Sequence, residues 1–347
     1  MRSRRHLLAD SAQLVQQLRA LPRVLPNQDV KYYKIDIKEF FMNGEHHDIA
    51  RAAISLLPRD MRGSVELMIL FLLREQFVAA PHHFVRFTEG REFQRLFRVS
   101  RGSGMGLPMS RELSDANFLV EAEDSYCLRS GICHEHGVFY YGRYADDILV
   151  IFVDTVCETR MRFLQGFKRH SRSYPLKVES VSSDEVQMLD MLISLGPDGK
   201  FVTKPFVKPT SQRNFLSDRS YHHPNIHMCW PIGYLSRLRR ISTHESDARR
   251  AQLQFLSELL AQCPSHVARF AMQSSIFNPR ASAKADFGRC SWLVLPYTRY
   301  WLSAGIGGFL REQAANGSKL MPNLNVRLCW RNCAPDWYVR LRKKAMA

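Results

Sequence analysis

The sequence predicts an α+β fold in which an antiparallel sheet with helices is followed by a mostly helical region. Three observations support this prediction. The run Ile148 to Val153 is continuously apolar, as a buried strand is. Strand and helix patterns around it follow one another irregularly, which excludes the regular alternation of a doubly wound parallel sheet. From about residue 210 strand patterns become rare and helical spacing dominates.

Length and charge narrow the class of protein. A chain of 347 residues can bury a large core and form two or three subdomains. Its 49 Lys and Arg against 33 Asp and Glu give a net charge of +16, which favours a polyanionic partner, nucleic acid first and an acidic membrane second. The longest apolar run, Leu67 to Leu73, is far shorter than the ~20 residues of a membrane span. Residues 1–20 lack the apolar core of a signal peptide, so we expect an intracellular protein that is not secreted.

The eight cysteines are scattered along the chain. Cys133-His-Glu-His136 and the pair Cys329 and Cys333 contain metal-binding residue types, but neither has a matching second pair. We therefore expect reduced structural thiols.

The first third of the chain predicts three helices and a strand. The expected helices are 9–21, 47–57 and 64–79, and the expected strand begins at Lys31 and ends near Asp36. The first helix is predicted to start at a cap formed by Ser11. The third is apolar on nearly every side, as a buried helix is.

A hairpin, a glycine-rich loop and a helix are expected next. They are a hairpin over 84–99 with its turn at Glu89-Gly90, a loop over 101–110, and a helix from a cap near Ser114 to about Tyr126. Glycine lets a backbone approach closely, so Gly102-Ser-Gly-Met-Gly106 can contact a phosphate or a base pair. The loop is not a phosphate-binding P-loop, because no Gly-Lys-Ser/Thr follows it.

The remaining patterns predict more helices than strands. They are a basic amphipathic helix at 158–171, strands at 177–181 and 187–194, a turn at 197–199, and helices at 230–241, 247–262 and 297–314. In helix 230–241 apolar residues recur every three positions, while Arg237 and Arg240 fall on another face.

Two adjacent carboxylates, Asp146 and Asp147, stand immediately before the apolar strand. A strand points successive side chains to opposite faces, so both can serve one site only if the chain bends there, as at a hairpin tip. Anionic groups beside a buried strand are costly unless a cation neutralises them. Mg²⁺ prefers one or two carboxylates together with substrate phosphates. The alternative is a solvated hairpin turn with Asp-Asp at its corner.

A third carboxylate, Asp36, closes the first predicted strand, far before Asp146 in the sequence. A two-metal site for phosphoryl transfer needs carboxylates from separate elements that converge on one point. Two neighbouring strand ends that carry Asp36, Asp146 and Asp147 would supply them. The alternative role of Asp36 is that of a helix cap for the next segment.

Together these segments resemble reverse transcriptases, and most closely those of the Penelope-like retroelements, a telomerase-related lineage of retrotransposons. Asp36 matches the first motif, Gly102 to Asn117 the second, and Tyr144-Ala-Asp-Asp147 the third. Shorter matches extend the resemblance over roughly residues 10–345; they are 84–106 with Gln94, Met188-Leu-Asp190, Asp198-Gly-Lys200, Lys208-Pro-Thr210, His223-Pro224, 237–242 and Glu245-Ser-Asp247.

The resemblance implies a right-hand polymerase, with a remnant of the fingers and palm-leading helix at 1–29, a reverse transcriptase palm at 30–205 and a thumb-like, mostly helical, basic domain at 206–347. It implies an RNA-directed DNA polymerase that extends a primer 3′-end with deoxynucleotides by two-metal phosphoryl transfer. Asp36, Asp146 and Asp147 would be catalytic and would bind Mg²⁺ or Mn²⁺. The implied partners are an RNA template, a DNA primer and deoxynucleoside triphosphates, with no membrane, and the lineage implies a nuclear location.

The resemblance also assigns binding residues. Phe41, in the segment just after Asp36, would pack under the sugar and exclude a 2′-hydroxyl, although Phe40 and Phe41 also fit a purely structural role in the core. The rest of the nucleotide site would be formed by Ile37, Met105 and Gly106. Contacts to the duplex backbone are expected from Arg213, Arg219, Arg237, Arg239 and Arg240, for each of which a solvated helix face is the alternative.

The sequence departs from the family at both ends and in the second motif. Asp36 lies so close to the start of the sequence that we expect most of the fingers to be lacking, and we also expect the GIY-YIG endonuclease after the thumb to be lacking. The second motif carries Leu107-Pro108 and Arg111 in place of the usual residues. Three alternatives stay open: a fingerless, catalytically inactive remnant that binds nucleic acid, an RNA-templated RNA polymerase, which Phe41 disfavours, and a basic structural protein in which Asp36 lies far from Asp146.

Overall fold

The computed structural model describes residues 6–86, 92–105, 108–208, 215–216, 220, 224–262, 290–297 and 325–332. The chain divides into two compact units, Met1–Phe206 and Val207–Ala347. The sequence predicts a boundary between a palm and a thumb at residues 205 and 206, and that assignment stays a prediction. Residues 6–29, expected as a separate remnant, belong to the first unit.

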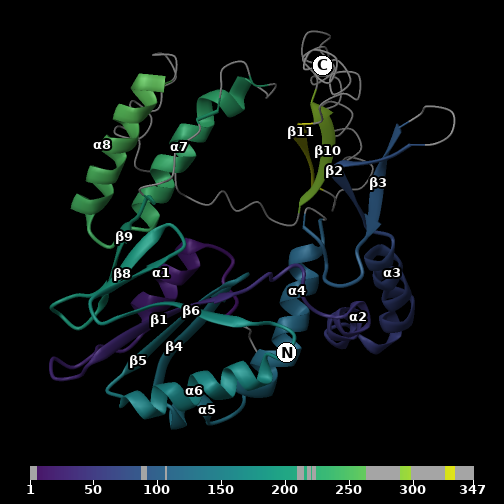
Figure 1. Ribbon diagram of the computed structural model, residues 1–347. Helices are drawn as coiled ribbons and strands as arrows, with labels where there is room; N and C mark the ends of the chain where they lie inside the picture. The colour runs from purple at the N-terminus through teal and green to yellow at the C-terminus, as the bar shows by residue number, and fades with distance from the viewer. Residues whose placement is uncertain are drawn as a thin grey trace. The chain divides into compact units, whose positions relative to one another are not determined.

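The first unit mixes helices with antiparallel sheets, as the sequence predicts (Figure 1). Its helices are α1 (Ser11–Ala20), α2 (His46–Ser55), the 3₁₀ turn η1 (Arg59–Met61), α3 (Arg62–Arg74), α4 (Ser110–Phe118), the π-helix η2 (Leu119–Cys127), α5 (Ile132–Glu135) and α6 (Cys157–His170). Its strands are β1 (Val30–Ile37), β2 (Phe77–Arg86), β3 (Glu92–Arg98), β4 (Val138–Tyr144), β5 (Asp147–Val153), β6 (Leu176–Ser182), β7 (Glu185–Met188), β8 (Met191–Leu195) and β9 (Phe201–Pro205).

The main sheet has the strand order β4-β5-β1-β6, and every neighbouring pair is antiparallel. Alternate residues of β1 face opposite sides of this sheet. Tyr33, Ile35 and Ile37 join a core with apolar residues of α4, η2 and α6, so these helices cover one face. Figure 1 shows α6 on that side, and β8 and β9 on the other.

The opposite face of β1 carries Tyr32, Lys34 and Asp36. Tyr32 is fully buried against Phe201 of β9, with the two rings edge to face and their centroids 6.3 Å apart. Burial decreases along the strand from Tyr32 through Lys34 to Asp36. The β7–β9 sheet therefore covers one end of this face and leaves the end with Asp36 accessible.

The strand expected over 187–194 is a tight hairpin instead. β7 and β8 pair antiparallel, and Met188 lies opposite Met191. The two turn residues are Leu189 and Asp190, and Leu189 has a positive φ of 56°. The prediction of one strand was wrong because the turn contains no glycine or proline and the apolar pattern continues through it.

Helix α3 is exposed on one side, which contradicts the prediction of a helix buried all round. Ile69, Leu70 and Leu73 are buried in a cluster with residues of α2 and α4. Leu67 and Phe71 are 72% and 66% exposed. The helix also ends at Arg74 rather than at residue 79, because β2 begins at Phe77.

Two predicted caps lie elsewhere. Asp10 caps α1 by accepting a bond from the N–H of Gln13 at 2.8 Å, while Ser11 donates to Asp190 Oδ1 at 2.5 Å. Helix α4 begins at Ser110, so Ser114 is inside it. The hairpin of β2 and β3 begins earlier than expected, and its turn at Glu89-Gly90 lies outside the described residues.

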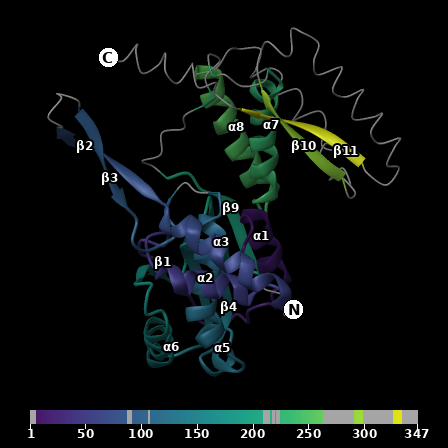
Figure 2. The ribbon, with the colours of Figure 1, turned by 90° about the vertical axis from the view of Figure 1, so that its right-hand side faces the viewer.

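The second unit contains helices α7 (Pro224–Arg240) and α8 (Glu245–Gln262) and strands β10 (Cys290–Tyr297) and β11 (Asn325–Asn332). Figure 2 shows the two helices side by side, and Leu235 and Leu238 of α7 pack on Phe255 and Leu259 of α8. The two strands form a parallel pair, which the sequence did not predict. Beyond Tyr297, the helix expected over 297–314 lies outside the described residues. None of the helices that the structure describes is long and apolar enough to cross a membrane.

Candidate active site

Asp36 and the Asp146-Asp147 pair meet at one end of the main sheet. The antiparallel register of β1 and β5 sets Asp36 directly opposite Asp147. The next residue, Ile37, donates its N–H to the carbonyl oxygen of Asp146 at 2.9 Å. Directly opposed residues of an antiparallel pair point to the same face, so Asp36 and Asp147 share the accessible face of the sheet.

The chain bends sharply at the aspartate pair, as expected for a hairpin tip. Tyr144 of β4 lies opposite Asp147 of β5, so Ala145 and Asp146 form the turn between them. Ala145 has a positive φ of 51°. Tight hairpin turns require this conformation, which costs an alanine about 1 kcal/mol or more.

Two lysines hold the carboxylates of this site. Lys38 Nζ lies 3.1 Å from Asp36 Oδ2, and Lys34 Nζ lies 3.2 Å from Asp147 Oδ1 and 2.9 Å from Glu179 Oε2. Burial lowers the pKa of Lys34, but Glu179 and Asp147 outweigh this and raise it above its ordinary value. Lys34 therefore stays protonated.

The surroundings of Asp146 disfavour its charged form. Partial burial raises the pKa of the carboxyl, and the charges of Asp147 and Asp36 raise it further. A hydrogen bond from the backbone of Asp146 itself and, to a smaller extent, the charge of Lys34 lower the pKa but do not cancel this rise. A carboxyl with a raised pKa beside two other carboxylates is a group that a bound cation would stabilise in its charged form.

Carboxylate oxygens are the ligands that Mg²⁺ prefers, and three carboxylates lie on the two neighbouring strand ends. Asp36, Asp146 and Asp147 are the residues that would hold it. Within the described part of the chain, however, no three His, Cys, Asp or Glu side chains are grouped so that they could hold a metal ion. The carboxylates of Asp36 and Asp147 are instead directed to Lys38 and Lys34.

The glycine-rich loop is bonded to the segment that follows β1. The N–H groups of Ser103 and Gly104 donate to the carbonyl oxygen of Phe41 at 2.9 and 3.1 Å, and Gly102 N–H donates to Gly44 O at 2.8 Å. Gly102 and Gly104 both have positive φ. This contact was not predicted, and it fixes the position of Phe41 relative to the loop.

The loop is further held by a buried serine cluster. Ser103 Oγ donates to Ser110 O at 3.0 Å and lies 2.7 Å from Ser114 Oγ. Ser110 Oγ donates to Ser103 O at 2.9 Å. These bonds attach the loop to α4 and explain why serine lies inside that helix.

The expected nucleotide-binding residues differ in accessibility. Phe41 is partly buried against the core, with its ring 5.2 Å from that of fully packed Phe40. Ile37 is buried in the same core and its N–H is bonded to Asp146, so its side chain is closed to a ligand. Met105 is 73% exposed, and Gly106 lies outside the described residues.

The second unit carries the expected arginine cluster. Arg237, Arg239 and Arg240 are exposed at the end of α7, and Arg239 Nε lies 3.3 Å from Glu245 Oε2. Arg213 and Arg219 lie outside the residues that the structure describes.

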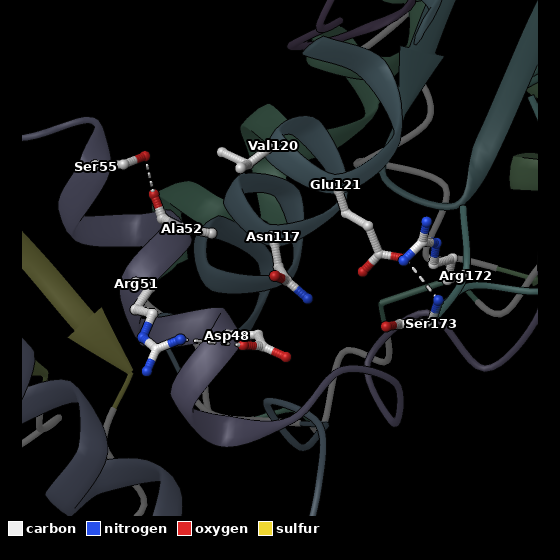
Figure 3. Close-up of a pocket in the computed structure, with 9 residues that line it drawn as sticks. All are labelled: Asp48, Arg51, Ala52, Ser55, Asn117, Val120, Glu121, Arg172 and Ser173. Carbon is white, nitrogen blue, oxygen red and sulfur yellow. Dashed lines mark hydrogen bonds and ion pairs between the residues drawn. The ribbon is translucent and has the colours of Figure 1, made fainter. Parts of the chain in front are cut away.

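One pocket of the first unit, with a volume of about 520 Å³, contains none of the three aspartates (Figure 3). Its lining carries two acids, Asp48 and Glu121, and two arginines, Arg51 and Arg172. Asp48 and Arg51 of α2 lie 4.0 Å apart, and Glu121 of η2 accepts the N–H of Ser173 at 2.6 Å. Because these charges compensate one another, the pocket offers no clear preference for a charged ligand.

Sequence reasoning missed Lys34 and Arg143 at this site. Lys34 and Asp36 are alternate residues of one strand, so period-two alternation places both on one face and was a usable signal. Arg143 is fully buried beneath the turn. A single arginine in an apolar strand gives no such signal, because its partners come from distant segments.

No protein-family model and no curated protein matches this chain. One matching solved structure is apo telomerase from Candida tropicalis, with 11% sequence identity and a TM-score of 0.44. The match covers 79% of this chain and 47% of that chain, so this chain spans about half the length of that protein. At this identity and TM-score the likeness assigns neither a family nor an activity.

Proposed function

We propose that this chain is a nucleotidyltransferase of the palm-type polymerase class, with Asp36, Asp146 and Asp147 as its catalytic carboxylates. The observation that carries the proposal is the register that sets Asp36 opposite Asp147, although the two residues are far apart in the sequence. A basic structural protein with a coincidental Asp-Asp turn would leave them far apart in space as well.

Within that class we propose an RNA-directed DNA polymerase related to the Penelope-like retroelements, which extends a primer 3′-end with deoxynucleotides on an RNA template in the nucleus. The order of the three sequence motifs supports this assignment. The bonded contact between the glycine loop and Phe41 also supports it, because it joins the first two motifs around one site. Residues 30–205 would then be the palm, and the second unit the thumb.

Divalent ions, when bound, would lower the pKa of the primer 3′-hydroxyl and stabilise the leaving pyrophosphate. The chain itself contributes carboxylate oxygens from two separate elements, β1 and the turn before β5. The partly buried ring of Phe41 would lie under the sugar and exclude a ribonucleotide. The exposed arginines of α7 would bind duplex phosphates without a preference for sequence.

Primer extension by the full chain tests the proposal. We expect deoxynucleotide incorporation on an RNA template with Mg²⁺, and a loss of about a thousandfold in Asp146→Asn, since removal of a metal ligand costs several kcal/mol of transition-state stabilisation. Asp198→Asn is the control, because Asp198 lies in the turn between β8 and β9, where its side chain accepts the N–H of nearby Lys200. Equal incorporation by Asp146→Asn and the wild type refutes the assignment.

The direction of the carboxylates toward Lys34 and Lys38 favours one other candidate, a catalytically inactive remnant that binds nucleic acid through its basic residues. This candidate predicts that the wild-type chain binds a primer–template duplex but incorporates no nucleotide with Mg²⁺ or Mn²⁺. A measured binding affinity together with the extension assay distinguishes the two functions.

A further inference from the structure

Arg143 of β4 is the largest side chain of the described residues that is completely buried. A buried cation is costly unless its hydrogen-bond donors are paired. Its backbone is fixed as well, because Arg143 N–H donates to His6 O and Arg143 O accepts from Leu8 N–H, both at 2.8 Å. The residue therefore has a single, tightly held position directly behind the aspartate turn.

One side of the guanidinium is bound by a buried carboxylate. Glu123 of η2 is also completely buried, and its two oxygens accept from Arg143 Nε and Nη2, both at 2.9 Å. This bidentate pairing fixes the plane of the guanidinium. Two further groups face Glu123, namely the hydroxyl of Tyr141 at 2.7 Å and His6 Nε2 at 3.4 Å.

The remaining nitrogen of the guanidinium reaches the turn. Arg143 Nη1 donates to the carbonyl oxygen of Ala145 at 2.9 Å and to Asp115 Oδ1 at 2.5 Å. Ala145 is the residue with positive φ that turns the chain into Asp146. An unfavourable backbone conformation persists only where surrounding contacts enforce it, and this hydrogen bond is such a contact.

We propose that Arg143 is a positioning residue, which transmits the fixed position of Glu123 on η2 to the carbonyl of Ala145 and so sets the place of Asp146 and Asp147 opposite Asp36. Its importance for catalysis rests on the proposed function, whereas its effect on the turn does not. Lysine cannot replace it, because one ammonium cannot pair bidentately with Glu123 and also reach Ala145.

Hydrogen exchange of the Ile37 amide reports the position of the turn, since this amide donates to Asp146 O. In the full chain without nucleotide, we expect the Ile37 amide hydrogen of Arg143→Lys to exchange about five- to tenfold faster than that of the wild type, which is the effect of losing one hydrogen bond. In primer extension the same variant should lower kcat by about a hundredfold, the effect of a displacement near 1 Å, with KM for nucleotide changed less than about threefold.

Tyr140→Phe is the matched control. Tyr140 lies on the same strand as Arg143 but away from the turn, and the variant removes the hydrogen bond from Tyr140 Oη to Gln17 Oε1 at 2.6 Å. It should change neither the exchange rate of the Ile37 amide nor kcat. Asp115→Ala is a second test that keeps the Arg143–Glu123 pair, so it applies if Arg143→Lys does not fold. Asp115 is partly exposed and accepts from the same Nη1 that donates to Ala145 O. Its loss should loosen that nitrogen at the turn and so also accelerate exchange at Ile37.

Wild-type exchange at Ile37 in a folded Arg143→Lys, or in Asp115→Ala if Arg143→Lys does not fold, overturns the proposal. Accelerated exchange supports it, even if the wild-type chain shows no polymerase activity. In that case the proposed function fails and the positioning role stands.

Discussion

Replacing Gly102 by alanine tests how the glycine-rich loop is held against the segment after β1. Gly102 has a φ of +79°, a conformation that costs an alanine about 1–2 kcal/mol. A Cβ at this position would lie 2.5 Å from Phe41 O and 2.6 Å from Met42 Cα, which are backbone atoms without rotamer freedom. If the loop moves away, it loses the contact to Phe41 O, which accepts two N–H groups at once, and the bond to Gly44 O, and we take each of these two contacts to contribute about 1 kcal/mol. We expect the free energy of unfolding to fall by about 3–4 kcal/mol.

Thermal unfolding of the full chain followed by circular dichroism measures this loss. For a unit of about 200 residues it corresponds to a decrease in Tm of roughly 6–16 °C. Gly63→Ala is the control, because Gly63 lies in the first turn of α3 and an added Cβ meets nothing within 4 Å. Alanine there should leave Tm unchanged or raise it slightly. A Tm for Gly102→Ala within about 2 °C of the wild type would refute the reasoning about the docked loop.

Three further predictions concern charge and nucleotide choice. Burial raises the pKa of Glu123, but Arg143 and His6 outweigh it and hold that pKa at about 2, below the ordinary 4.5. The ionised Glu123 carboxylate therefore stabilises the folded chain fully above pH 4.5, and this contribution is lost as the pH falls toward 2. Glu123→Gln should cost about 3 kcal/mol in urea unfolding at pH 7 and much less near pH 2, and an equal cost at both pH values contradicts this. Replacing Arg237, Arg239 and Arg240 by alanine should reduce the slope of log affinity for a nucleic-acid duplex against log salt by about 0.9 for each phosphate that is no longer bound, and an unchanged slope removes them from the interface. Phe41→Ala should raise incorporation of ribonucleotides relative to deoxynucleotides by about tenfold in primer extension, whereas an unchanged ratio argues against its role at the sugar.

The bend at Asp146-Asp147 was predictable from the sequence, because two adjacent acids before an apolar strand serve one site only at a turn. The pairing of Asp36 with Asp147 was expected only through the order of motifs, since no local pattern fixes a register between strands so distant in the sequence. The hairpin of β7 and β8 was missed for a related reason. Its turn uses Leu189 in a positive-φ conformation, where glycine or asparagine is the usual residue.

The environment of α3 shows another limit of sequence patterns. An apolar surface on every side predicted burial, yet Leu67 and Phe71 are exposed in the structure. A helix pattern reports how much apolar surface is available, not how many neighbours reach it. Buried Arg143 and Glu123 show the converse, because each is acceptable in the core only through a partner that belongs to a different element of the chain.

The lysines of the site form ion pairs that must break before its carboxylates can bind a cation. Lys38 is 48% exposed, so its separation from Asp36 costs little, as for other surface ion pairs. Lys34 is only 11% exposed, but it also contacts Glu179 at 2.9 Å. If Asp147 turns toward Asp36 and Asp146, Lys34 keeps Glu179 as its partner and no buried charge is left unpaired. Strand alternation on β1 thus places Lys34 on the same face as Asp36. The ion pair between Lys34 and Asp147 can break at low cost, and the proposed metal site requires that it breaks.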